Sequence, residues 1–148
     1  MLLSKQDKLA GMLRNVVLTL ALALQVGPVA ADGNGEAAMR AVIETQLAAF
    51  RSGDAETAYA QASPEIHSIF PNTQVFFAMV RVGYAALIAP REVRYLGAVQ
   101  DNGQPVYRVL VEGRGGQRWM ALYQMSQQPA GEWLISGCVL VRLAGELT

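Results

Sequence analysis

The chain has 148 residues, and its 12 Lys and Arg side chains balance its 12 Asp and Glu side chains. This length suits one folded domain, and the balanced charge excludes a strongly basic protein that binds nucleic acid. One histidine and one cysteine are too few for the usual three or four nitrogen and sulfur ligands of a metal ion. No metal and no other cofactor is therefore expected.

The amino terminus has the layout of a secretory signal peptide. Lys5, Lys8 and Arg14 precede an uncharged apolar run at 16–24, and a helix-breaking Gly-Pro pair and small residues follow it. The run is much shorter than the ~20 residues that a helix needs to cross a bilayer. We expect a signal that is removed, with an uncleaved anchor as the alternative, and no stable membrane span afterwards.

Cleavage after Ala31 is the first expectation, and cleavage after Ala30 is the alternative. The signal would then comprise residues 1–31, and the mature protein would be periplasmic or secreted. In that oxidising space the lone Cys138 can form no internal disulfide, so the stability of the domain must come from its hydrophobic core.

The rest of the chain reads as helices followed by strands. We expect a short linker at 32–35, one domain at 36–143 and a tail at 144–148. Apolar residues recur at helical spacing first, and capping residues mark where new helices begin. The predicted helices are 36–51, roughly 55–61, a short one that starts at Ser63-Pro64-Glu65, and 75–82 after the cap Asn72-Thr73.

After Gly83 the apolar residues alternate, which is typical of strands. Turn signals separate the predicted strands, which lie near 92–99, 106–112, 117–125 and 132–143. Short turns between such strands indicate an antiparallel meander. In the last strand the alternation predicts that Trp133, Ile135, Val139 and Val141 face the core. The expected fold class is α+β, with the N-terminal helices packed on a curved four-stranded antiparallel sheet.

Several stretches carry a family resemblance. They are Val42-Ile43, Gln46-Leu47, Ala49-Phe50, Asp54, Ala58-Tyr59, Ala62-Ser63-Pro64, Ile66, Phe76, Met79-Val80, Gly83-Tyr84, Trp119, Ala121-Leu122-Tyr123, Trp133, Ile135, Gly137-Cys138 and Leu140. In these stretches the chain resembles a bacterial family described as domain of unknown function 4864. Its order of elements resembles the cystatin-like, nuclear transport factor 2-like superfold, which implies a cone of helices on a bent sheet.

This resemblance implies an architecture and no reaction, so it assigns no catalytic residue. The superfold hosts isomerases, dehydratases, secretion partners and binding modules. From the residues themselves, His67 is the one candidate general base, with Glu65 or a tyrosine as its orienting partner. Cys138 is a candidate nucleophile only if a base lies near it, and a small buried residue in a strand is the simpler interpretation.

Aromatic residues supply much of the apolar surface of this small domain, and such rings either fill a core or line a ligand cavity. Gln46 lies on the apolar face of the first predicted helix, where a polar amide needs a partner. It points into a pocket or bonds to the backbone or a buried water. The candidate ligand-binding residues are Gln46, Tyr59, Tyr84, Trp119 and Tyr123.

The leading hypothesis is an exported, non-catalytic module that binds a small apolar ligand or a protein partner. One alternative is a small pocket enzyme, similar to an isomerase or dehydratase, with His67 as base and Tyr84 or Tyr59 as hydrogen-bond donor. Another is a structural subunit that forms a homodimer through its sheet, as members of the superfold do.

Overall fold

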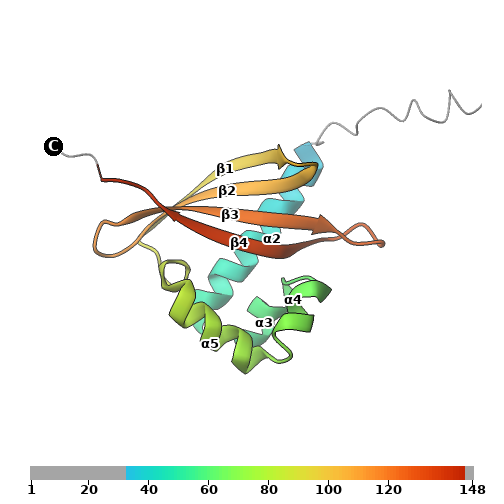
Figure 1. Ribbon diagram of the computed structural model, residues 1–148, viewed down its shortest axis with the longest axis horizontal. Coiled ribbons are helices and arrows are strands. Elements are labelled where there is room, and N and C mark those ends of the chain that lie inside the picture. Colours follow the sequence, from blue (N-terminus) through green and yellow to red (C-terminus); the bar gives the residue numbers. More distant parts are fainter. Residues whose placement is uncertain (1–32, 146–148) are drawn as a thin grey trace, which may run out of the picture. The chain divides into compact units, whose positions relative to one another are not determined.

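The computed structural model describes residues 33–145, so the expected signal peptide at 1–31 lies outside the described residues. The elements, labelled in Figure 1, are α2 (Gly33–Ser52), α3 (Ala55–Ala60), α4 (Pro64–Ile69), α5 (Thr73–Gly83), the 3-10 turn η1 (Ala85–Leu87), β1 (Glu92–Asp101), β2 (Gln104–Glu112), β3 (Arg118–Gln127) and β4 (Trp133–Arg142). The strands form one antiparallel sheet in the order β1-β2-β3-β4. The expected α+β class, with helices first and a meander after them, is confirmed.

The helix α2, which is the longest in the residues that the structure describes, packs against the sheet through its apolar stripe. Met39, Ile43, Leu47 and Phe50 recur at helical spacing and are all buried. The helix begins at Gly33, so positions 33–35, expected as part of a linker, belong to α2. In the residues that the structure describes, no helix is long and apolar enough to cross a membrane.

The short helices begin at the expected capping residues. Asp54 Oδ1 accepts a hydrogen bond from the Thr57 amide at 3.1 Å, and Asn72 Oδ1 accepts one from the Val75 amide at 2.9 Å. These bonds satisfy amides that the helix itself leaves unpaired. Ser63 occupies the third cap position, but its hydroxyl makes no capping bond.

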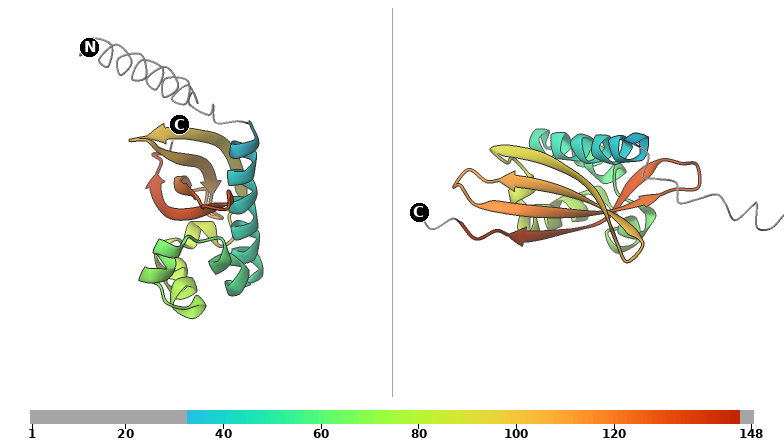
Figure 2. Two further views of the ribbon diagram at one scale, coloured as in Figure 1. Left: turned by 90° about the vertical axis from the view of Figure 1, so that its right-hand side faces the viewer. Right: turned by 90° about the horizontal axis from the view of Figure 1, so that it is seen from above.

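The sheet is bent, and α2 runs alongside it, with α3, α4 and α5 grouped near the C-terminal end of α2 (Figure 2). Two irregularities in the strand pairing accompany the bend. The β1–β2 register shifts between Tyr95 and Gly97, where Gly97 has a φ of +88° that favours glycine. The β3–β4 register shifts where Gln124 pairs with Gly137 and the next residue pairs with Ile135. Bulges of this kind increase the local twist of a strand.

The prediction of which β4 side chains face the core is wrong beyond Ile135, because of the second bulge. Ile135 is buried as predicted, and Trp133 packs against the core. Val139 and Val141 are instead exposed by 50% and 43%. The extra residue of the bulge reverses the alternation, so Cys138 and Leu140 are the side chains that pack against the core.

The reversal leaves an apolar stripe on the outer face of the sheet, which faces away from α2. Val139 pairs with Leu122, and Val141 pairs with Met120, which in turn pairs with Leu110. These five residues, which we call the outer patch, are half-buried or exposed. A contiguous apolar surface on a sheet is typical of an interaction site.

The loop between α3 and α4 is attached to the free edge of β4. The Ser63 amide donates to the Ile135 carbonyl at 2.8 Å, and the Ile135 amide donates to the Gln61 carbonyl at 2.9 Å. This pairing holds α3, α4 and β4 together around the interior of the domain. It therefore helps to position the walls of the cavity described next.

Candidate functional site

A cavity of about 250 Å³ lies between the helices and the sheet. Its wall draws on α2, the loop before α4, α4 and the residue after it, α5, η1, β3 and β4. The lining residues are Gln46, Phe50, Ala62, Ile66, Phe70, Phe76, Met79, Val80, Tyr84, Leu87, Tyr123, Gln124, Ile135, Gly137, Cys138 and Val139. Among them there is no acidic residue, lysine, arginine or histidine, so this wall is apolar with a few neutral polar groups.

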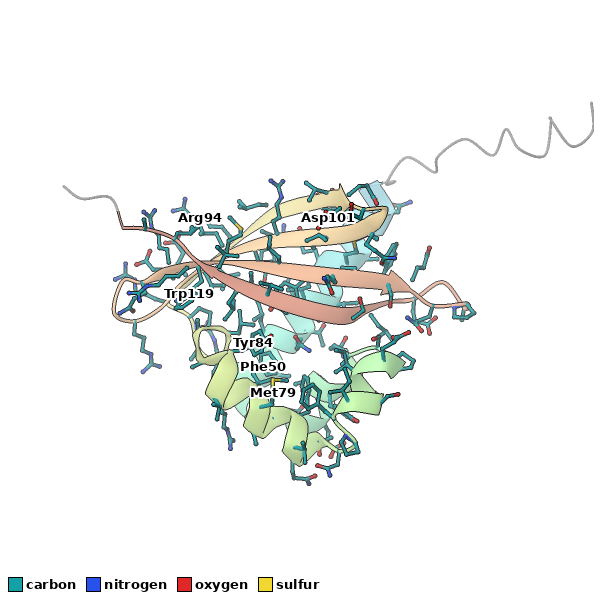
Figure 3. All side chains as sticks on the ribbon, in the orientation of Figure 1. Phe50, Met79, Tyr84, Arg94, Asp101 and Trp119 are labelled. Carbon is teal, nitrogen blue, oxygen red and sulfur yellow. The ribbon has the colours of Figure 1, made fainter. Side chains whose placement is uncertain are left out.

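The helical side of the cavity is formed by apolar residues. Figure 3 shows Phe50, Met79 and Tyr84 grouped between the sheet and α5. Phe50 makes ring contacts with Phe76 and Phe77, with centroid distances of 6.4 and 5.8 Å. The periodicity of α5 predicts these apolar positions, but nothing local in the sequence indicates that they border an empty space.

Three of the five candidate ligand-binding residues lie in the cavity wall. These are Gln46, Tyr84 and Tyr123, which come from α2, from the end of α5 and from β3. Gln46 is buried, and its Nε2 donates to the Ala58 carbonyl at 3.1 Å. Both readings of Gln46 therefore hold, because it bonds to the backbone and also borders the cavity. Within residues 33–145 its carboxamide oxygen makes no hydrogen bond.

Tyr84 and Tyr123 are two neutral phenols with different surroundings. The Tyr84 hydroxyl donates to the Cys138 carbonyl at 2.8 Å, and burial, with a smaller effect of the Cys138 thiol, raises the pKa of Tyr84. Tyr123 is fully buried, and its hydroxyl has no hydrogen-bond partner within the described residues. Burial raises the pKa of Tyr123 well above its ordinary value, so this hydroxyl keeps its proton and remains a donor.

The other two candidates lie outside the wall. Tyr59 connects the short helices, because its hydroxyl donates to the Phe70 carbonyl. Trp119 is half-buried on β3, and the guanidinium carbon of Arg142 lies 5.8 Å from its ring centroid. Figure 3 shows Trp119 on the sheet, at a distance from the group around Tyr84.

The candidate base His67 does not line the cavity. Its ring stacks on Tyr59 with centroids 3.9 Å apart, and its Nε2 lies 2.8 Å from the Tyr59 carbonyl oxygen. A carbonyl only accepts, so Nε2 carries the proton and donates. The tyrosine that the sequence offered as a partner thus holds His67 through stacking and a backbone bond. In the part of the chain that the structure describes, no hydrogen bond or ion pair joins His67 to Glu65 or to Cys138.

Cys138 lies in the cavity wall, and burial raises the pKa of its thiol to about 12. The thiolate is the reactive form of cysteine, so a thiol with this pKa is a poor nucleophile at neutral pH. In the segment 33–145, no group of three or more His, Cys, Asp or Glu side chains is arranged to hold a metal ion.

We expect Cys138 to be almost inert to alkylation in the folded protein. At pH 8 a thiol with a pKa of about 12 is ionised to about one part in ten thousand, whereas an ordinary thiol is ionised to about a quarter. Iodoacetamide should therefore modify the folded protein roughly a thousandfold more slowly than the chain in denaturant. Intact-mass measurements over time follow both reactions. Equal rates in the two states would show that the thiol is accessible and readily ionised.

The fold and the cavity together define a small α+β domain with an apolar interior pocket, walled by helices on one side and an antiparallel sheet on the other. A family model described as domain of unknown function (DUF4864) matches residues 33–148. The chain belongs to this family. Comparison with curated proteins and with solved structures gives no match.

Proposed function

We propose that this domain is a non-catalytic module that binds a small, mainly apolar molecule in its interior cavity. The observation that carries this proposal is a cavity of about 250 Å³ whose wall is mostly aliphatic and aromatic. Ligand sites are typically concave and apolar, with a few well-placed polar groups. Gln46, Tyr84 and Tyr123 supply such groups here.

The arrangement of side chains favours binding over catalysis. General acid–base chemistry needs a group whose protonation changes near neutral pH and that reaches the substrate. His67 lies outside the wall, and the three titratable groups in the wall, Tyr84, Tyr123 and Cys138, all have raised pKa values. All three remain protonated at neutral pH, so they serve as neutral binding groups.

The architecture is consistent with the cystatin-like, nuclear transport factor 2-like superfold, and we propose this assignment. Helices that precede a bent four-stranded antiparallel meander, with a cavity between the two, support it. We also propose that the protein is exported to the periplasm or secreted. The charged, apolar and small-residue segments of 1–31 support export.

Native mass spectrometry of the protein purified from the exported fraction of its own host tests the binding function. We expect a subunit mass that corresponds to cleavage near Ala31 and an additional small-molecule mass that is lost on gentle activation. The purified protein should also bind naphthalene, an uncharged probe, because a ~150 Å³ apolar cavity already holds benzene. Protein that carries no added mass and does not bind naphthalene would contradict the proposed function.

A second candidate function is a structural subunit that dimerises through its sheet. The outer patch favours it, because apolar residues continue across three neighbouring strands on the face away from the helices. The same patch on two copies can pair about a two-fold axis. Val139 belongs both to the patch and to the cavity wall, so such a dimer would lie next to one border of the cavity.

If the outer patch forms a dimer, Val141→Glu should convert it to a monomer, because each copy would then bury an unpaired carboxylate at the interface. Val141 is 43% exposed and does not line the cavity. Val82→Glu is the control, since Val82 is 89% exposed on α5 and not part of the patch. Sedimentation velocity measures both variants and the unchanged protein. A monomeric unchanged protein at high concentration would exclude this candidate.

A further inference from the structure

The Tyr123 hydroxyl is a buried polar group that the protein itself leaves unpaired. Two such atoms occur in residues 33–145, the hydroxyls of Ser63 and Tyr123. Of these two residues, only Tyr123 lines the cavity. Burying a hydroxyl without a partner costs free energy, which a ligand in the adjacent cavity can recover. Because Tyr123 is 0% exposed, a ligand reaches the hydroxyl only when the side chains that cover it shift.

The other polar groups of the wall define what the partner can be. The Tyr84 hydroxyl already donates its proton to the Cys138 carbonyl. Gln46 uses its Nε2 for the Ala58 carbonyl, which leaves its carboxamide oxygen as an acceptor. Gln124 also lines the cavity, but its side chain is exposed to solvent. Among the buried side chains of the wall, Tyr123 therefore offers a donor without a partner and Gln46 an acceptor without one.

The wall also defines the charge of the ligand. A carboxylate or an ammonium group would lose its hydration there, and no oppositely charged side chain lines the cavity to replace it. An uncharged oxygen needs only hydrogen bonds, which Tyr123 and Gln46 can supply. The cavity should therefore bind alcohols and ketones more tightly than the corresponding carboxylic acids, because these acids are ionised at neutral pH.

We propose, on the basis of the proposed binding function, that the ligand is a neutral, mainly apolar alcohol or carbonyl compound whose oxygen accepts a hydrogen bond from the Tyr123 hydroxyl. An alcohol can also donate its own proton to the Gln46 oxygen. The apolar part of the molecule lies against the rings and aliphatic chains of α5, including Phe76 and Val80. The cavity limits the molecule to a size somewhat above that of benzene.

Three probes of similar size and different polarity test this inference: naphthalene, 2-naphthol and 2-naphthoate. Their dissociation constants are measured at pH 7 by protein-observed NMR titration. We expect 2-naphthol to bind roughly three- to tenfold more tightly than naphthalene, which is the usual value of one hydrogen bond. We expect 2-naphthoate to bind at least about tenfold more weakly than 2-naphthol, because of its uncompensated charge.

Tyr123→Phe removes the hydroxyl and keeps the ring. In this variant the preference for 2-naphthol over naphthalene should fall below about twofold, while naphthalene itself binds as before. Tyr107→Phe is the matched control, because Tyr107 is buried directly opposite Tyr123 on β2 and does not line the cavity. Its preference for 2-naphthol should be unchanged. The Tyr123→Phe variant should melt no lower than the unchanged protein, since it loses an unpaired hydroxyl.

The possible outcomes separate this inference from the function on which it rests. If naphthalene binds but 2-naphthol gains nothing, or if Tyr123→Phe keeps the preference, the role of the hydroxyl is overturned and the cavity remains a binding site. If 2-naphthoate binds most tightly, the neutral class of ligand is overturned. If no probe binds, the proposed function fails and the inference fails with it. The ranking of the probes on the unchanged protein tests the inference even if the variant does not fold.

Discussion

Val80→Phe should abolish naphthalene binding by filling the cavity from the α5 side. Val80 is 3% exposed and lines the cavity. A phenyl ring takes up roughly the space of benzene, for which a ~150 Å³ cavity is sufficient. The cavity has a volume of about 250 Å³. The part of it that the new ring leaves empty would be too small for naphthalene. We expect the dissociation constant to rise at least about thirtyfold, measured by the same NMR titration.

The control for this substitution is Val82→Phe. It places the same ring on the same helix, at a position that is 89% exposed and outside the cavity wall. Naphthalene should bind this variant as it binds the unchanged protein. Larger side chains usually strain a packed core by about 1–3 kcal/mol, but an adjacent empty space relieves that strain. Val80→Phe should therefore fold, and unchanged binding by that variant would place the binding site elsewhere.

The largest effect on stability is expected from Phe50→Ala. Phe50 is 3% exposed and contacts the rings of Phe76 and Phe77, so it joins α2 to α5. Truncation of a buried phenylalanine removes its transfer free energy and leaves a cavity, which together cost about 3–5 kcal/mol. This is a large part of the 5–15 kcal/mol that stabilises a typical domain. Urea denaturation measures the change in the free energy of unfolding.

Two further substitutions show whether the loss comes from packing at this position. Phe50→Leu keeps most of the apolar volume and should cost much less than Phe50→Ala. Ile69→Ala removes apolar atoms from α4 at a side chain that is 66% exposed, and it should change the free energy of unfolding by no more than about 0.5 kcal/mol. A small loss for Phe50→Ala would mean that α2 and α5 are held together by other contacts.

The helices and strands follow closely from local features of the chain. Asn72 and Asp54 accept the capping bonds that their sequence positions predict, and all four strands occur near the expected ranges. The apolar periodicity of α2 places Ile43 and Phe50 in the core. Capping and periodicity depend on residues three or four positions apart, so they can be read from the sequence.

The candidate site was predictable only in part. The sequence marks Gln46 as a polar residue on an apolar helix face, and it lies in the cavity wall. Tyr59 and Trp119 share their aromatic character with Tyr84 and Tyr123, yet the structure places the first two outside the wall. Aromatic character indicates burial. It does not indicate which buried rings border an empty space.

The sequence by itself determined the order of the helices and strands and the amphipathic face of α2, because each depends on short-range spacing. Only the tertiary structure decided which face of β4 is buried beyond Ile135, since one bulge residue reverses the alternation of the strand. It also brought Gln46 of α2 and Tyr123 of β3 into one cavity wall and left the Tyr123 hydroxyl without a partner. Packing between segments far apart in the chain produces that arrangement, and no local pattern records it.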